Sequence, residues 1–174
     1  MKKYELINPQ EVNGIILYQV KALIDFSDIK AGDIGGWIEK EENLSQEGDC
    51  WVSGNARVFG DARVTGNAWV SGNAWVSGNA YVYGNAQVYG NARVYGNAIV
   101  FGNAGVSGNA RVFGNAIVFE NAIVSGNAIV YGNAQVSGNA QVSGNASVSG
   151  DARVFENAKV YGDAIVSGDV QIIK

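Results

Sequence analysis

Residues 84–101 read GNAQVYGNARVYGNAIVF, which is three copies of the hexapeptide Gly-Asn-Ala-x-Val-x. The repeat extends in both directions, from Gly48 to the last residue, as 21 hexads without one insertion or deletion. Valine occupies every sixth position from Val52 to Val166, twenty times in succession, and Ile172 completes the series. A short, fixed period of this kind is typical of a solenoid, in which each repeat stacks on its neighbours.

Within each hexad, the segment Ala-x-Val-x alternates apolar and variable residues, which is the period of a β-strand. The Gly-Asn pair that follows suits a sharp corner, because both residues tolerate positive φ. Six residues per side is the period of the triangular left-handed β-helix, which has three sides per coil. We therefore predict an all-β fold: a left-handed triangular parallel β-helix of about seven coils over residues 48–174, with alanine and valine inside.

Residues 1–47 do not follow the repeat. Residues 16–26 alternate with the period of a strand, which predicts one long half-buried strand. The turn signal Asn13-Gly14 comes just before this strand and allows Tyr4–Ile7 to pair with it. Because the first coil of a β-helix otherwise exposes an unpaired strand edge, we expect residues 1–47 to form a small N-terminal β cap.

The composition argues against several functional classes. The 174 residues include no histidine, which removes the commonest general base and a common metal ligand. The single cysteine, Cys50, leaves no internal disulfide and no cysteine-cluster metal site. We expect no metal and no cofactor. The formal net charge of −4 argues against a nucleic acid polymer as a partner.

The N-terminal segment does not read as a targeting signal. Met1-Lys2-Lys3 is basic, but no apolar segment follows it, and no apolar run of membrane-spanning length occurs in the chain. We therefore expect no membrane insertion and a cytoplasmic location, in which Cys50 stays reduced.

Several motifs precede or open the repeat within Ala22–Gly60: Asp33-Ile34-Gly35-Gly36-Trp37, Asn43-Leu44-Ser45 and Gly48-Asp49-Cys50-Trp51-Val52. Together with the hexads, they resemble the hexapeptide-repeat superfamily, best known from bacterial acyltransferases. The similarity is closest to short phage and prophage hexapeptide-repeat proteins that are labelled transferases by analogy. The resemblance implies the β-helical fold over essentially the whole chain. Acyltransferases of the superfamily typically rely on a histidine base and on loops that leave the coils, and neither is present in the repeat of this chain. We therefore expect a protein that is not an enzyme.

The outward residues are the variable part of the repeat, so we expect any binding function to lie there. Sorted by 18-residue register, they form three faces. The first face begins at Trp51, the second at Arg57 and the third at Arg63.

On the third face, three successive coils carry only uncharged aromatic or branched residues at their outward positions: Tyr81, Tyr83, Ile99, Phe101, Ile117 and Phe119. A contiguous apolar patch of this size usually marks an interface. Rows of aromatic side chains also stabilise a sheet that has no partner. We predict self-association through this patch into a homo-oligomer, with a trimer as the first expectation and a dimer as the second.

On the second face, Arg93 and Arg111 are predicted to stack one coil apart, beside an aromatic column of Tyr95, Phe113 and Tyr131. Guanidinium groups next to aromatic rings suit a small anionic ligand, such as a nucleotide. Arginines on the surface of a sheet also serve simply to keep a protein soluble, so both interpretations stay open.

We expect no cap comparable to residues 1–47 after the last coil. This coil is expected to expose the ends of the valine columns, at Val160, Val166 and Ile172, together with unpaired backbone groups that can template strand addition. We predict an end-to-end contact between two molecules at this coil. Such a contact closes as a dimer, because the cap blocks head-to-tail growth.

The sequence thus predicts a non-catalytic, phage- or prophage-type β-helical protein that acts as a rigid self-assembling scaffold or binding surface. The first alternative is a protein that sequesters a small host ligand, such as a nucleotide signal. The second alternative is a degenerate acyltransferase-like protein.

Overall fold

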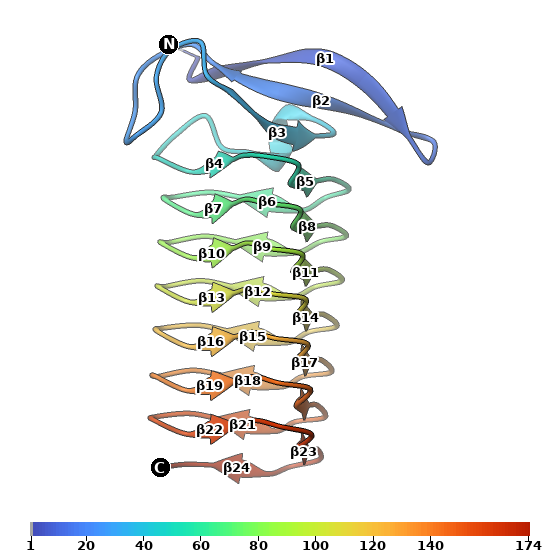
Figure 1. Cartoon of the computed structure of the whole chain (residues 1–174), viewed down its shortest axis with the longest axis vertical. Helices are drawn as coiled ribbons and strands as arrows, with labels where there is room; N and C mark the ends of the chain where they lie inside the picture. The colour runs from blue at the N-terminus through green and yellow to red at the C-terminus, as the bar shows by residue number, and fades with distance from the viewer. Residues whose placement is uncertain (1) are drawn as a thin grey trace.

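The computed structural model describes residues 2–174 and is built almost entirely of short β-strands that stack into a triangular prism (Figure 1). The first face contains β4 (Trp51–Val52), β7 (Trp69–Val70), β10 (Gln87–Val88), β13 (Gly105–Val106), β16 (Ile123–Val124), β19 (Gln141–Val142) and β22 (Lys159–Val160). The second face contains β5 (Arg57–Val58), β8 (Trp75–Val76), β11 (Arg93–Val94), β14 (Arg111–Val112), β17 (Ile129–Val130), β20 (Ser147–Val148) and β23 (Ile165–Val166). The third face contains β6 (Arg63–Val64), β9 (Tyr81–Val82), β12 (Ile99–Val100), β15 (Ile117–Val118), β18 (Gln135–Val136), β21 (Arg153–Val154) and β24 (Gln171–Ile172).

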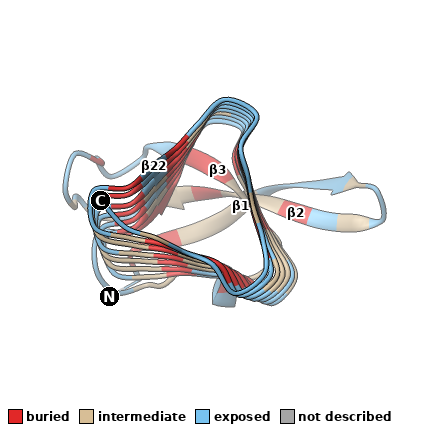
Figure 2. Ribbon diagram, turned by 90° about the horizontal axis from the view of Figure 1, so that it is seen from below, coloured by how far each residue is buried: buried red, intermediate tan, exposed pale blue. Residues whose placement is uncertain are grey.

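The prism winds as a left-handed coil. In Figure 1 the chain crosses the front through the first face, passes the second face on the right and returns behind through the third face. Each coil lies below the one before it, so the path is counter-clockwise when it is followed away from the N-terminal cap. Figure 2 shows the triangle from the C-terminal end. The predicted left-handed triangular β-helix, with seven regular coils from β4 to β24, is confirmed.

Parallel hydrogen bonds fix the register between coils. The backbone N–H of Arg93 donates to the carbonyl of Ala110 at 2.9 Å, and that of Asn91 donates to the carbonyl of Gly108 at 2.7 Å. Strand pairs therefore join residues 18 apart, such as Arg93 with Arg111. This regular ladder leaves few backbone groups inside the stack without a partner, as buried polar groups require.

The corners turn through residues at positive φ. Gly96 has a φ of +71°, and a Cβ placed there would lie 3.0 Å from the backbone nitrogen of Gly114 in the next coil. Glu120 and Glu156 occupy this position at another corner, with φ values of +60° and +59°. The Glu120 carboxylate accepts a hydrogen bond from the N–H of Gly138 at 2.6 Å, which offsets part of the cost of a non-glycine corner.

Asparagine side chains form hydrogen-bonded columns along the corners. Asn91 donates through Nδ2 to Oδ1 of Asn109 at 3.1 Å, and Asn109 donates in the same way to Asn127 at 2.9 Å. Such amide ladders reinforce the stacking of identical strands.

The core is a stack of alanine and valine. All alanines from Ala56 to Ala158 and all valines from Val52 to Val154 in the repeat columns have an exposed fraction of 0%. Figure 2 shows these buried residues along the inner surface of the triangle. The variable residue of each strand points outward, as the alternation predicted.

The N-terminal cap begins with a hairpin of β1 (Tyr4–Val12) and β2 (Ile15–Ala22). Asn13 and Gly14 form its turn, with φ values of +52° and +81°. β2 pairs with β3 (Ile34–Ile38), and β3 pairs in parallel with β5, so the cap extends the second-face sheet to ten strands. The tip of the hairpin projects sideways beyond the second face (Figure 1).

The hairpin differs from the strand predicted over residues 16–26. β2 ends at Ala22, where the Ala22 carbonyl accepts a hydrogen bond from Gly32 N–H at 2.8 Å and the chain leaves the sheet. The register shifts between Gln19 and Lys21, which interrupts the alternation. Leu17 is therefore buried, whereas Ile16 is 52% exposed.

A partial coil precedes the regular ones. Ile38 pairs with Val58, and Leu44, just after the 3-10 turn η1 (Glu41–Asn43), pairs with Val64. Both apolar side chains are fully buried. They continue two of the valine columns, so the stack starts before residue 48, at which the repeat signature begins. The stack thus has about eight turns, of which seven are regular.

Core burial between coils is expected to set the stability of the prism. Replacing Val112 with alanine, in the middle of the stack, should lower the free energy of unfolding by about 2 kcal/mol. The same change at Val166, on the same face in the last coil and only partly buried, should cost less than half as much. Urea unfolding followed by tryptophan fluorescence measures both. Equal losses would contradict the view that cover by the next coil determines the contribution of each valine.

Candidate functional site

The third face carries a flat aromatic ladder. The rings of Tyr83 and Phe101 stack with centroids 4.9 Å apart and planes 2° from parallel, and those of Phe101 and Phe119 stack at 5.2 Å and 5°. Ile99 and Ile117 lie beside this ladder as paired residues of β12 and β15. The structure thus brings together the six residues of the predicted self-association patch, which span three consecutive coils.

This apolar patch is partly exposed and contains no charge. Tyr81 has an exposed fraction of 36%, and the other five residues are partly buried. The nearest cations of the same column, Arg63 and Arg153, lie beyond the patch at either end. The patch is suited to packing against another apolar surface.

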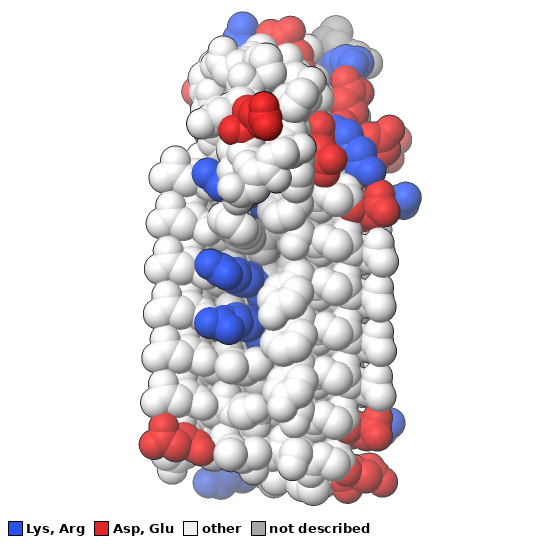
Figure 3. Space-filling model, turned by 90° about the vertical axis from the view of Figure 1, so that its right-hand side faces the viewer, with Lys and Arg blue, Asp and Glu red and all other residues white. Residues whose placement is uncertain are grey.

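The second face carries a row of cations and rings. The guanidinium groups of Arg57 and Arg93 lie over the Trp75 ring, at 5.4 Å and 5.1 Å from its centroid. Arg111 pairs with Arg93 on the next strand. Figure 3, which views this face, shows cationic side chains one above the other beneath the overhanging cap, with acidic side chains on the cap and near the lower corners of the prism.

An aromatic ladder runs along the same face. Tyr95 and Phe113 stack at 4.8 Å, and Phe113 and Tyr131 stack at 5.2 Å. The five residues of the predicted ligand site therefore lie on one face, as expected. We call the depression lined by Phe59, Trp75, Ser77, Arg93, Tyr95 and Arg111 the arginine–aromatic groove.

Sequence reasoning missed two parts of this groove. Trp75 belongs to the same column as the arginines, but its place between two guanidinium groups was not anticipated. The tip of the hairpin adds a hollow of about 160 Å³ at the upper end of the groove, lined by Val12, Asn13, Ile15, Leu17, Arg57, Phe59 and Trp75. The 18-residue spacing places Trp75 between Arg57 and Arg93 in one column, so this contact could have been inferred from the sequence. No sequence pattern indicates the direction in which the hairpin projects.

The predicted end-to-end contact involves residues of the last coil. Val160 is 4% exposed, and Val166 and Ile172 are partly buried. Ile165, the outward neighbour of Val166, is 77% exposed. The contact itself stays a prediction.

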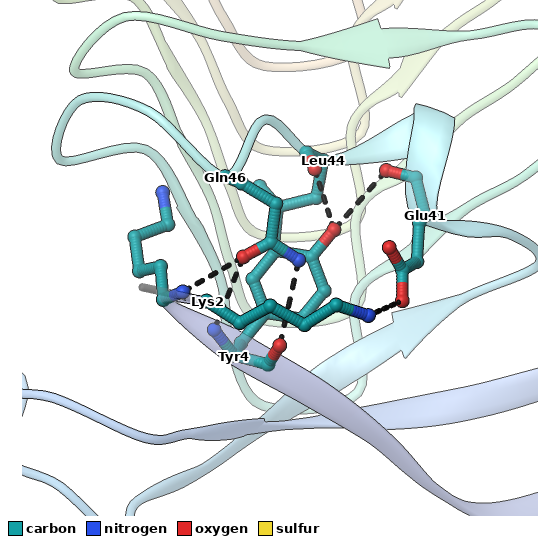
Figure 4. A network of polar contacts seen from close by, with 6 residues as sticks. Lys2, Tyr4, Glu41, Leu44 and Gln46 are labelled. Carbon is teal, nitrogen blue, oxygen red and sulfur yellow. Dashed lines mark hydrogen bonds and ion pairs between the residues drawn. The ribbon is translucent and has the colours of Figure 1, made fainter.

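The cap contains a buried polar network (Figure 4). The Tyr4 hydroxyl donates to the Leu44 carbonyl, and Oε1 of Gln46 accepts the backbone N–H of Lys3 at 2.8 Å. The Lys3 side chain is 2% exposed and donates to the Cys50 carbonyl at 3.0 Å. Within residues 2–174, no buried side-chain nitrogen or oxygen lacks a partner. The network therefore attaches the cap to the first coil.

The buried thiol does not have the character of a nucleophile. Burial raises the pKa of Cys50, because desolvation outweighs the nearby positive charge of Lys3. The thiol stays protonated near neutral pH, whereas the thiolate is the reactive form. Burial, followed by the charge of Glu41, likewise raises the pKa of the Tyr4 hydroxyl.

The side chain of Trp51, which opens the first face in β4, is buried under the cap and is not part of the exposed surface. It is 1% exposed, because the rings of Tyr4 and Phe26 cover it, at centroid distances of 6.4 Å and 5.4 Å.

Among residues 2–174, no group of three or more His, Cys, Asp or Glu side chains is placed to hold a metal ion. No helix in this part of the chain is long and apolar enough to cross a membrane.

A comparison with protein families identifies the repeat. A model described as the YdcK beta solenoid repeat matches eight stretches, which together cover about half of the chain: 56–72, 86–102, 92–108, 104–120, 110–126, 122–138, 134–149 and 140–156. The chain belongs to the YdcK β-solenoid repeat family. The hexapeptide-repeat relationship expected from the sequence is therefore confirmed.

A curated relative also supports the assignment of the family. The protein named "Uncharacterized acetyltransferase YdcK" from Escherichia coli (strain K12) is 39% identical over 61 residues. The match covers 30% of this chain and 19% of the relative. The match thus spans about a fifth of the curated YdcK protein, so the activity in that protein's name applies to that protein alone. Phage origin, cytoplasmic location and oligomeric state stay predictions for this member of the YdcK repeat family.

The raised pKa values predict a loss of stability at alkaline pH. The unfolded state releases protons from a cysteine above pH ~8.5 and from a tyrosine above pH ~10. The folded state holds them longer, so the free energy of unfolding is undiminished below pH ~8.5 and falls as the pH rises beyond it.

The variant Cys50→Ala tests this prediction, because alanine occupies the same column in the regular coils. Its urea midpoint should stay level up to pH ~10, whereas that of the unmodified protein should begin to fall near pH ~8.5. Identical pH profiles for the two proteins would show that Cys50 does not contribute.

Proposed function

We propose that this member of the YdcK repeat family is a non-catalytic scaffold that assembles with copies of itself through the third face. The supporting observation is the ladder of Tyr83, Phe101 and Phe119 beside Ile99 and Ile117, a continuous and uncharged surface across three coils. Contiguous apolar patches of this kind are rare on monomeric proteins and usually mark an interface.

The regularity of the ladder favours a second copy of the chain as the occupant. Its rings lie within 5° of parallel and repeat with the spacing of the coils. A second copy carries ridges of the same pitch, so two faces can interdigitate along their length. Closed symmetry then gives a trimer or a dimer of prisms. The absence of charge within the patch removes the repulsion that otherwise keeps like surfaces apart.

Four observations support the absence of catalysis. The chain has no histidine to serve as a general base. From Gly48 onward, every carboxylate lies at a corner, in the glycine or asparagine column, where it replaces a corner residue. The one thiol is buried in the cap network. The regular coils carry no loop that would build an acceptor pocket.

Replacing Ile99 and Ile117 with lysine should yield a folded monomer, because the interface would then have to bury unpaired charges. Sedimentation velocity reports the assembly size, and circular dichroism reports the β content. The matched control replaces Gln87 and Ile123 with lysine, at the same strand positions two coils apart on the first face.

The control variant should keep the assembly of the unmodified protein. An unmodified protein that sediments as a monomer at micromolar concentration would refute self-assembly. An assembly that survives in the Ile99/Ile117 variant would move the interface away from the third face.

Incubation with acetyl-CoA and a panel of amine and hydroxyl acceptors should give no acetyl transfer above the rate in buffer, since no side chain is positioned as a base. Release of free thiol, followed by a colorimetric reagent, measures turnover. Turnover that disappears when a single carboxylate, such as Glu120 or Asp151, is replaced by its amide would contradict the proposal and support an enzyme.

A further inference from the structure

The charges of the solenoid are segregated between its faces and its corners. The cations at outward strand positions are Arg57, Arg63, Arg93, Arg111, Arg153 and Lys159, whereas the acids of the same region occupy only corner positions. Three of these cations, Arg57, Arg93 and Arg111, lie in one column of the second face. This column therefore has a positive potential that no acid within the face cancels.

The lower part of the arginine–aromatic groove presents hydrogen-bond donors. None of the four ion pairs among residues 2–174 involves Arg93 or Arg111. A second open depression shares these two arginines with the groove and is also lined by Ile129, Asn91, Asn109 and Asn127. Each of Asn91 and Asn109 uses one amide hydrogen to bond the next asparagine, which leaves its second one free. A set of donors without a carboxylate is suited to an anion.

The Trp75 ring restrains the side chain of Arg93, which is one of these donors. The ring lies against the guanidinium group of Arg93, at 5.1 Å from the centroid. This contact restricts the rotamers of Arg93. Less conformational freedom is then lost when Arg93 binds a ligand.

The hollow at the upper end of the groove is lined mostly by apolar residues, and Arg57 is the one charged residue of its lining. Phe59 meets the Trp75 ring edge-to-face at 5.9 Å, and the hairpin contributes Val12 and Leu17 to the opposite wall of the hollow. Its lining includes no acid, and the hollow shares Phe59 and Trp75 with the groove in which Arg93 and Arg111 lie. A flat aromatic ring suits such a mostly apolar hollow beside the rings of Phe59 and Trp75.

We propose that the arginine–aromatic groove binds a small ligand in which a planar aromatic ring is joined to a phosphate chain, as in a nucleoside diphosphate. The ring occupies the hollow beneath the hairpin, beside Phe59 and Trp75. The phosphate groups contact Arg93 and Arg111, which lie on adjacent strands.

The spacing of the strands agrees with this assignment. Trp75, Arg93 and Arg111 occupy three successive strands of one sheet, and adjacent strands are ~4.8 Å apart. The ring and the outer phosphate are therefore separated by roughly 10 Å, which is two strand spacings. The proposal is independent of self-assembly, because the groove and the third-face patch share no residue.

Isothermal titration of the full chain with ADP, adenosine and pyrophosphate tests the site. ADP should bind more tightly than either fragment, because each fragment fills only one half of the groove. ADP affinity should also decrease as salt is added, since the contact with the arginines is ionic. Replacing Arg93 and Arg111 with glutamine should weaken ADP at least about 100-fold, about tenfold for each arginine.

The matched control replaces Arg63 and Arg153 with glutamine, two exposed arginines at equivalent strand positions on the third face. It removes the same charge and should change ADP affinity less than about threefold, as expected for distant charges. Thermal melting of both variants verifies that they fold.

Three results would overturn the proposal. The first is no binding of ADP at millimolar concentration. The second is an equal loss of affinity in the two double variants, which would mean a diffuse attraction to positive charge. The third is pyrophosphate binding as tightly as ADP, which would leave the hollow beneath the hairpin without a role.

Discussion

The parallel hydrogen bonds between coils require that each side of the triangle contain six residues. Arg93 N–H reaches the Ala110 carbonyl, and Asn91 N–H reaches the Gly108 carbonyl, only if the corners of successive coils superimpose. Corner residues must then adopt positive φ, and a Cβ at the corner would lie about 3 Å from the backbone of the next coil, which favours glycine. The space beside each corner holds alanine, and the middle of each side holds valine. Half of every hexad is thus set by geometry and is not free to vary with function.

Function is therefore restricted to the outward positions, and the three faces use them differently. The third face combines aromatic rings with isoleucine and has no charge over three coils. The second face combines rings with cations, beneath a hairpin that belongs to the same sheet. On the first face, the cap buries Trp51, so this ring does not contribute to the exposed surface. Adjacent columns separated by one corner can thus carry different chemistry on an identical backbone.

The sequence predicted nearly all of the regular solenoid, because its period states which residues pair and which point inward. It predicted the membership of both outward clusters for the same reason, since residues 18 apart must be neighbours. It was less informative where the period stops. Ile38 and Leu44 continue the core without the Gly-Asn-Ala signature. The burial of Trp51 depends on Tyr4 and Phe26, which contact it from distant points of the chain. The overhang of Val12 and Leu17 depends on the twist of a hairpin, which local sequence does not encode.

The threefold periodicity has an evolutionary consequence. Gain or loss of a single hexad would leave the alanine and valine columns intact, since every hexad is equivalent inside the prism. Outside, the same event between Phe59 and Tyr95 would rotate all later residues by one side, so that Tyr95 and Phe113 would leave the column of Phe59. A gain or loss of 18 residues keeps every outward residue on its own face, so it changes only the length of the prism. A change of one hexad in this prism would therefore disturb the outward columns and leave the packing of the core unchanged.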